Sequence, residues 1–239
     1  MGRAYEVRKA SIAKTGAAKS KLYSIYAKDI YITAKNGGIY PESNQNLKRL
    51  LEKAKNDQVP NDIIKRAIDK VNSGVQENYD TLRYEGFGPG GATIIVDCLT
   101  DNVNRTISYI RGVFSKAKAK LGNSGSVSYL YDNYCILEFT GLTEEEVLNI
   151  LIDNEIDIKD IEIEDDNIVL YGDPTDIHRI KNAIINYKND IIFTIDEIAM
   201  IPQQKVKLNN DDLIAFKKLI QLLEDIEDVQ KIYYNVENM

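Results

Sequence analysis

The first part of the chain holds three segments in which apolar residues recur at helical spacing. Gly37-Gly38 ends the first pattern and Val59-Pro60 breaks the second, because glycine pairs and prolines rarely continue a helix. Pro60 or Asn61 is a suitable first residue for the third. The spacing predicts helices over residues 22–34, 47–54 and 61–71. We therefore expect a small helical domain over residues 1–78, ending in a polar linker.

From residue 79 the pattern changes to short apolar runs typical of strands. The glycine-rich turn 86–91 joins the first two runs, and Asp101 or Asn102 can cap the helix that follows. The predicted elements are strands at 82–86, 92–99 and 126–131, a helix at 102–117, and, near the C-terminus, a helix at 211–224 and a strand at 229–236. A lone helix and strand cannot form a core, so we expect this last pair to complete the earlier sheet. A middle α/β domain would then comprise residues 79–132 and 203–239.

Residues 133–202 have the pattern of a self-contained unit. Thr143 and Glu146 have the spacing of a capping box at the start of one helix. The expected order is strand, helix, strand, strand, helix, strand, which is that of a ferredoxin-like βαββαβ domain. Its first helix is predicted to bury Val147, Leu148, Leu151 and Ile152. The fold class is thus α+β multidomain, with this domain inserted in the middle one; three domains in a row is the alternative.

Charge is distributed unevenly along the 239 residues, although the net charge of −7 is moderate. Residues 1–72 carry 15 Lys and Arg against 7 Asp and Glu, a net of +8. Residues 73–129 have a net of +1, and residues 130–239 carry 9 Lys and Arg against 25 Asp and Glu, a net of −16. The chain therefore combines a cationic module with an anionic one.

The cationic module carries the strongest functional signal. Six Lys and Arg stand in the first 21 residues with only Glu6 to balance them, a pattern that favours salt-dependent binding to phosphates. Asn104 and Arg105 lie where a strand ends and a helix begins, a place that suits phosphate contacts through free amides. Plain capping by Asp101 and ordinary solvated helix faces are the alternatives. The predicted nucleic-acid-binding residues are Arg3, Arg8, Lys9, Lys14, Lys19, Lys21, Lys48, Arg49, Lys55, Asn104 and Arg105.

The sequence does not favour catalysis, a metal or a cofactor. The glycines of 86–91 match a dinucleotide-binding pattern, but a strand follows them where that motif needs a helix. Phe87 in this turn could still stack on a base. The carboxylates of 153–166 alternate with isoleucines as in a strand, and the lone His178 has no zinc or triad spacing. Cys98 and Cys135 stand in apolar runs, as expected of buried free thiols in a reducing compartment.

No apolar run approaches the ~20 residues of a membrane span, and no secretory signal is evident. We therefore expect a cytoplasmic protein without a membrane partner. The cationic module leads us to expect a nucleic-acid partner.

These segments together resemble the YebC family, which includes the mitochondrial translational activator of cytochrome oxidase. The opening Met-Gly-Arg3 and Val-Asn-Arg-Thr106 resemble its second, paralogous branch, and Tyr5 stands where the first branch usually has Trp. The matching stretches run from end to end: 1–3, 17–21, the helix that ends at Gly37, 53–55, 59–60, 83–91, 100–106, 125–130, 200–202 and 228–235.

The resemblance implies a three-domain fold with a helical first domain and the third domain inserted in the second. Family members are described as probable transcriptional regulators, and others are implicated in translation through consecutive prolines. Our first hypothesis is a non-enzymatic factor that binds the ribosome and its rRNA, with the acidic domain turned away from phosphate. A DNA-binding transcriptional regulator is the alternative, and a scaffold that binds a basic protein is a third reading. Residues 199–202 are read as an inter-domain connector, with a probing loop as the alternative.

Overall fold

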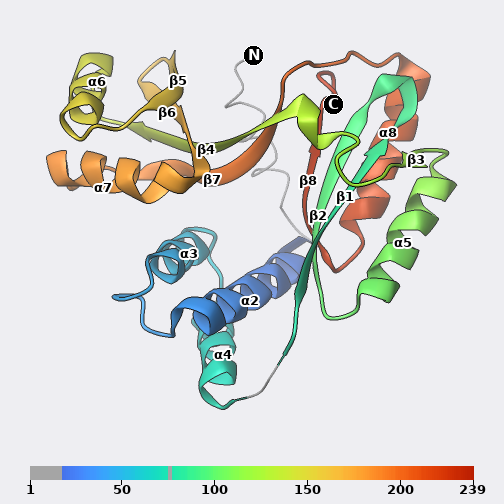
Figure 1. The fold of residues 1–239 in the computed structure, drawn as a ribbon, viewed down its shortest axis with the longest axis horizontal. Helices are drawn as coiled ribbons and strands as arrows, with labels where there is room; N and C mark the ends of the chain where they lie inside the picture. The colour runs from blue at the N-terminus through green and yellow to red at the C-terminus, as the bar shows by residue number, and fades with distance from the viewer. Residues whose placement is uncertain (1–17, 75–76) are drawn as a thin grey trace. The chain divides into compact units, whose positions relative to one another are not determined.

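The computed structural model describes residues 18–74 and 77–239 (Figure 1). Its first three helices are α2 (Ala18–Gly37), α3 (Gln45–Asn56) and α4 (Asn61–Asn72), which confirms the three predicted helices. Tyr26, Ile30, Leu47 and Ile64 are buried where these helices meet. The Asn44 side chain accepts a hydrogen bond from the Leu47 amide and so caps α3.

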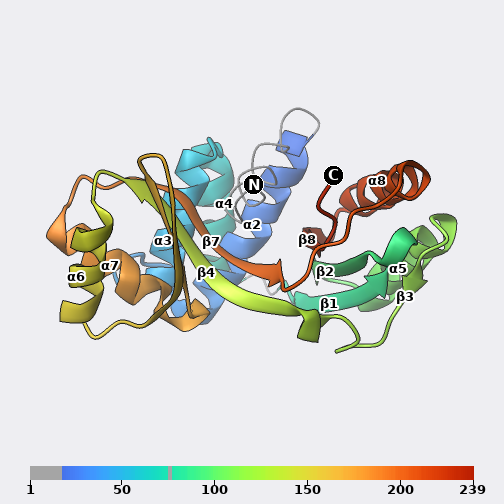
Figure 2. The same ribbon diagram turned by 90° about the horizontal axis from the view of Figure 1, so that it is seen from above.

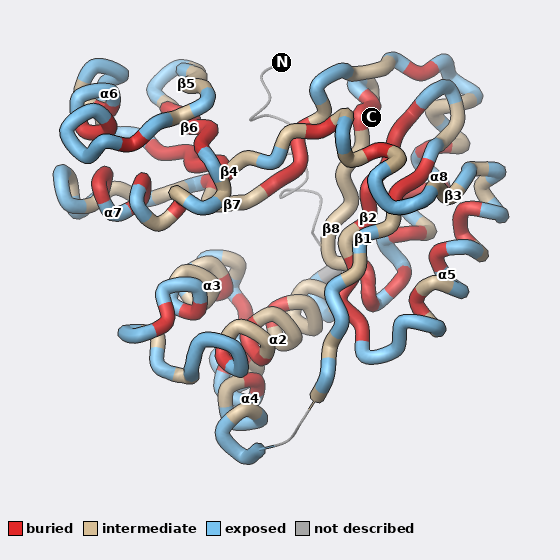
Figure 3. Tube along the Cα trace, viewed as in Figure 1, coloured by how far each residue is buried: buried red, intermediate tan, exposed pale blue. Residues whose placement is uncertain are grey.

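A four-stranded sheet with the order β3-β1-β2-β8 forms the second core. Its strands are β1 (Asp80–Phe87), β2 (Thr93–Thr100), β3 (Lys120–Leu121) and β8 (Val229–Tyr234). Alternate residues of β2 pack against α5 (Val103–Lys116) and α8 (Asn210–Glu224), and Figure 3 shows buried residues gathered along this strand. Antiparallel pairing of β8 with β2 confirms that the C-terminal strand completes the earlier sheet.

Residues 133–201 form a compact unit, and the described chain before and after them forms another. The second sheet has the order β5-β6-β4-β7, and its helices pack into one core with it. Its elements are β4 (Tyr131–Thr140), α6 (Glu144–Asp153), β5 (Ile158–Glu164), β6 (Asn167–Gly172), α7 (Ile177–Tyr187) and β7 (Phe193–Pro202). This order confirms the predicted βαββαβ unit, and both hydrogen bonds of the Thr143–Glu146 capping box are present. The limits of the three expected domains remain a prediction.

Two interpretations of this unit were wrong. Leu148 and Ile152, predicted to be buried, are 38% and 71% exposed, because the buried stripe of α6 runs through Val147, Ile150 and Leu151. Residues 199–202 are not a loop, and the chain passes from the compact unit 133–201 into the other unit after Ile201. These residues form the end of β7, where Ala199–Ile201 are buried.

The predicted strand at 126–131 is also wrong, and the reason is a buried carboxylate. Glu85 of β1 is 3% exposed, and it accepts hydrogen bonds from the amides of Gly125, Val127 and Ser128 at 2.8, 2.5 and 2.8 Å. These amides are therefore taken by a side chain and do not pair with a strand. The segment forms a loop with a 3₁₀ turn at Ser128–Leu130, and β4 starts only at Tyr131.

The glycine-rich turn closes the β1–β2 hairpin, as expected from the strand that follows it. A Cβ atom on Gly86 would lie 2.3 Å from Cε1 of Phe114, so a side chain there would displace α5. Gly90 has a φ of 64°, in the left-handed region that glycine tolerates best. Close packing thus explains Gly86 and backbone conformation explains Gly90, without a bound dinucleotide.

Cys98 and Cys135 are buried free thiols in the two separate cores, as predicted. Burial raises the pKa of the Cys98 thiol to about 12, which makes it a poor nucleophile near neutral pH. None of the helices in the two described ranges is both long and apolar enough to span a bilayer.

We expect Glu85→Ala to lower the free energy of unfolding by about 3 kcal/mol, since three amides lose a charged acceptor. Amide hydrogen exchange at residues 125–128 should accelerate in the same variant. Asp80→Ala, at an exposed position of the same strand, is the control. Unchanged exchange at 125–128 would show that Glu85 does not hold the loop.

Candidate nucleic-acid interface

The described part of the helical domain is cationic, with 11 Lys and Arg against 6 Asp and Glu over residues 18–72. Lys19 is exposed on the first turn of α2, and Lys48 and Lys55 are exposed on α3. Because seven residues make about two helical turns, Lys48 and Lys55 lie on the same face of α3. Among the residues that the structure describes, these three lysines and the exposed Lys65 of α4 form no ion pair. Their charges are therefore available to a polyanion.

Other predicted residues are placed differently. Arg49 of α3 is half-buried, whereas the lysines are exposed, and it interacts with other residues of the protein. Arg3, Arg8, Lys9 and Lys14 lie outside the described residues.

Lys21 has an internal role that sequence reasoning did not reveal. Its ammonium donates to the carbonyl oxygen of Glu224 and, at 2.8 Å, to that of Ile226, where α8 ends. A cation at this position satisfies carbonyls that the helix leaves without partners and complements the helix dipole. Burial lowers the pKa of Lys21, although Glu224 and Asp225 oppose this shift. Lys21 therefore joins α2 to the end of α8, and its charge is not available to a polyanion in the way that the charge of Lys19 is.

A second joining point is Asp228, which is 2% exposed between α8 and β8. Its carboxylate accepts hydrogen bonds from the Arg105 guanidinium at 3.0 and 3.1 Å and from the Thr106 hydroxyl at 2.8 Å. The Lys28 ammonium of α2 lies 3.4 Å away. Burial alone would raise the pKa of Asp228, but the hydrogen bonds from Arg105 and Thr106 and the charge of Lys28 hold it below its usual value.

The surroundings of Arg105 correct the sequence interpretation of the start of α5. Of the two expected caps, Asn102 is the one that caps the helix, by accepting a hydrogen bond from the Arg105 amide at 3.0 Å. Asp101 instead pairs with the Arg105 guanidinium at 2.7 Å. One of the amides expected to be free is thus occupied, and the cation expected to meet phosphate is bound to two carboxylates. Asn104 is exposed beside this cluster.

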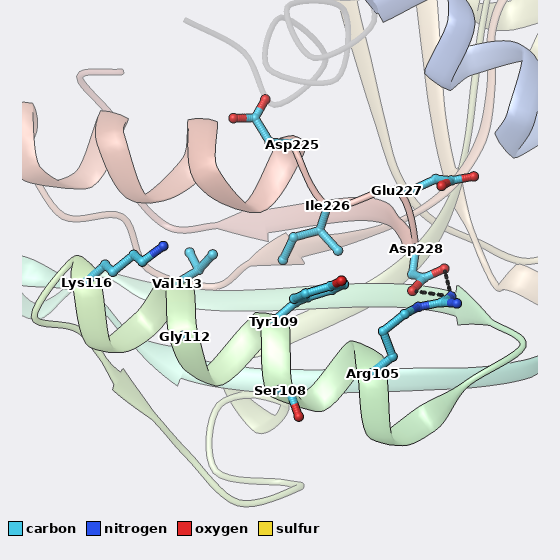
Figure 4. A pocket seen from close by; sticks show the side chains of 10 residues that line it. All are labelled: Arg105, Ser108, Tyr109, Gly112, Val113, Lys116, Asp225, Ile226, Glu227 and Asp228. Carbon is cyan, nitrogen blue, oxygen red and sulfur yellow. Dashed lines mark hydrogen bonds and ion pairs between the residues drawn. The ribbon is translucent and has the colours of Figure 1, made fainter.

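A groove of about 510 Å³ runs between α5 and the segment 225–228 (Figure 4). Arg105, Tyr109 and Lys116 line its α5 side, and Asp225 and Glu227 line the other. Arg105 faces Asp228 within the same lining. With three carboxylates against two cations, the groove does not favour a phosphate.

The middle domain contains a cationic stretch that its net charge does not reveal. Between Asn102 and Tyr131 there are five Lys and Arg and no Asp or Glu. Counting charge over residues 73–129 hid this stretch, because acids before residue 102 brought the net to +1. A search for acid-free runs would have found it.

Within residues 18–74 and 77–239, no three or more His, Cys, Asp and Glu side chains are grouped so as to hold a metal ion.

We expect Asp228→Asn to lower the free energy of unfolding by about 3 kcal/mol, because two cations lose their buried partner. Asp225→Asn, on an exposed residue of the same segment, is the matched control and should change stability little. The pKa of Asp228 is depressed in the folded state, so its contribution is complete above the ordinary value of 3.8. The difference between wild type and variant in urea unfolding should shrink as the pH falls below that value. A difference that stays constant to lower pH would contradict the ion-pair account.

Comparison with known proteins assigns the fold to a family. Residues 3–74 match the model described as TACO1/YebC protein N-terminal domain, and residues 79–236 match that of TACO1/YebC second and third domain. A probable transcriptional regulatory protein of Alteromonas mediterranea is 45% identical over 98% of both chains, and one of Shewanella oneidensis is 46% identical over 99% of both. The crystal structure of a conserved hypothetical protein from Aquifex aeolicus superposes with a TM-score of 0.77 at 31% identity, covering 94% of this chain and 93% of the other. The chain therefore belongs to the TACO1/YebC family.

Proposed function

We propose that this protein is a non-enzymatic translation factor that binds the ribosome through its rRNA and helps translation through stalling sequences such as consecutive prolines. The observation that carries the binding part is the set of exposed lysines on the helical domain, Lys19, Lys48, Lys55 and Lys65, which lack ion-pair partners among the described residues. The cations of the preceding arm adjoin them in sequence. The action on stalled ribosomes rests on the family resemblance.

The distribution of these lysines favours structured RNA over a DNA operator. They are spread over α2, α3 and α4, whereas a helix-turn-helix protein concentrates its base contacts on one recognition helix. Structured RNA is contacted mainly through phosphates and 2′-hydroxyls, which scattered cations can reach. The unit 133–201, with 4 Lys and Arg against 17 Asp and Glu, would be repelled by the same RNA. The protein would therefore bind with its helical domain toward the RNA.

Co-sedimentation with ribosomes at low and high salt tests this proposal. The triple variant Lys19→Ala, Lys48→Ala, Lys55→Ala should bind more weakly and reduce the slope of log affinity against log salt by about 2 to 3, one phosphate contact for each lysine. The matched control removes the exposed lysines 207, 217 and 218, with the same change in charge. Wild-type protein that stays free of ribosomes at both salt concentrations would refute the proposal.

A second candidate function, a DNA-binding transcriptional regulator, is favoured by the names of the relatives. It requires that a promoter duplex bind at least ~10³-fold more tightly than a random duplex of equal length. We expect equal affinity for the two duplexes in a competition assay at fixed salt. A strong preference for one promoter would favour regulation of transcription instead.

A further inference from the structure

The acid-free stretch of the middle domain includes three lysines at alternate positions. Lys116, Lys118 and Lys120 are all exposed where α5 passes into β3. Lys116 lines the groove that Asp225 also lines, whereas Lys118 and Lys120 form no ion pair with any residue that the structure describes. Lys118 and Lys120 therefore present positive charge to solvent without an acidic neighbour in sequence.

An exposed aromatic residue lies beside one of these lysines. Phe87 of β1 is directly opposite Lys120 in the antiparallel β1–β3 pair. Opposite residues of such a pair project to the same face with Cβ atoms about 5 Å apart. Phe87 is 37% exposed, and β3 is the edge strand of its sheet. Lys120 and Phe87 thus form one accessible corner.

A second aromatic residue is brought to this corner by Glu85. Residues 85 and 87 of a strand point to the same face, so the loop that binds the Glu85 carboxylate lies on the face of Phe87. Figure 2 shows the segment between β3 and β4 running along β1. Tyr129 follows Ser128, whose amide Glu85 holds, and is 68% exposed. We call Phe87, Lys118, Lys120 and Tyr129 the basic corner, which leaves out Lys116 because it lines the groove on the α5 side.

We infer that the basic corner binds unpaired nucleotides of RNA, with bases stacked on Tyr129 and Phe87 and phosphates held by the lysines. Exposed aromatic rings among unopposed cations are what a single strand requires, since it offers base faces and phosphates together. A protein partner would complement these lysines only if its own surface were strongly acidic. This inference rests on the proposed function and adds a second RNA contact, apart from the helical domain.

Lys118 allows a test that does not endanger the fold. It follows the last turn of α5 with a φ of 54°, and the next amide, of Ala119, donates to the Phe114 carbonyl at 2.9 Å. Glycine is the preferred residue at this left-handed position after a helix. Lys118→Gly therefore removes the cation and relieves the backbone, so its melting temperature should equal or exceed that of the wild type.

The experiment measures fluorescence anisotropy of the full chain with a single-stranded RNA of about 12 nucleotides and with a duplex of the same sequence. Tyr129→Ala should weaken single-strand binding about tenfold and leave its salt dependence unchanged, because stacking involves no phosphate charge. Lys118→Gly and Lys120→Ala should each reduce the salt slope by about 0.7. Tyr187→Ala, on a residue 58% exposed in the acidic unit, is the control.

Wild-type single-strand affinity in both Tyr129→Ala and Lys118→Gly would overturn the inference while the proposed function stood. If Tyr129→Ala weakened binding to the single strand and to the duplex equally, the inferred stacking of unpaired bases on Tyr129 would be overturned. A wild type that binds neither RNA nor ribosomes would instead refute the proposed function.

Discussion

The structure of the larger unit depends on one buried carboxylate, that of Asp228. Taking a charge out of water is costly, and the cost is offset only if enough partners surround it. Here the partners come from two helices, Lys28 of α2 and Arg105 and Thr106 of α5. Lys21 adds a contact from α2 to the last carbonyls of α8. The helical domain is thus joined to the middle domain by specific polar contacts.

This arrangement separates two uses of lysine that look alike in the sequence. Lys19 and Lys21 stand two residues apart on α2, yet one is exposed and the other is bound to α8. A polyanion can attract the first without disturbing the second. The cations that hold the unit together are therefore distinct from those proposed to bind RNA.

The sequence pattern predicted those elements whose ends are set by residues close together in the chain. Helix ends were predicted from Gly37-Gly38, Pro60 and the Thr143–Glu146 capping box. The βαββαβ order was predicted from the spacing of apolar residues, which differs between helices and strands. The errors have long-range causes. Residues 126–131 form a loop because Glu85, some 40 positions earlier, takes their amides, and Lys21 meets carbonyls more than 200 positions away. A periodicity read over a short window cannot contain such partners. For the same reason, the sequence pattern did not show that Lys21 and Arg105 bind groups within the molecule.

The Glu85 carboxylate also bears on how this surface can evolve. Glu85 of β1 sets the course of the loop before β4 by accepting hydrogen bonds from three of its backbone amides. Every residue except proline provides such an amide. Side chains on the outer surface of the loop can therefore be exchanged without altering its course. A relative with a different residue at the position of Tyr129 would keep the same loop and present another side chain on it.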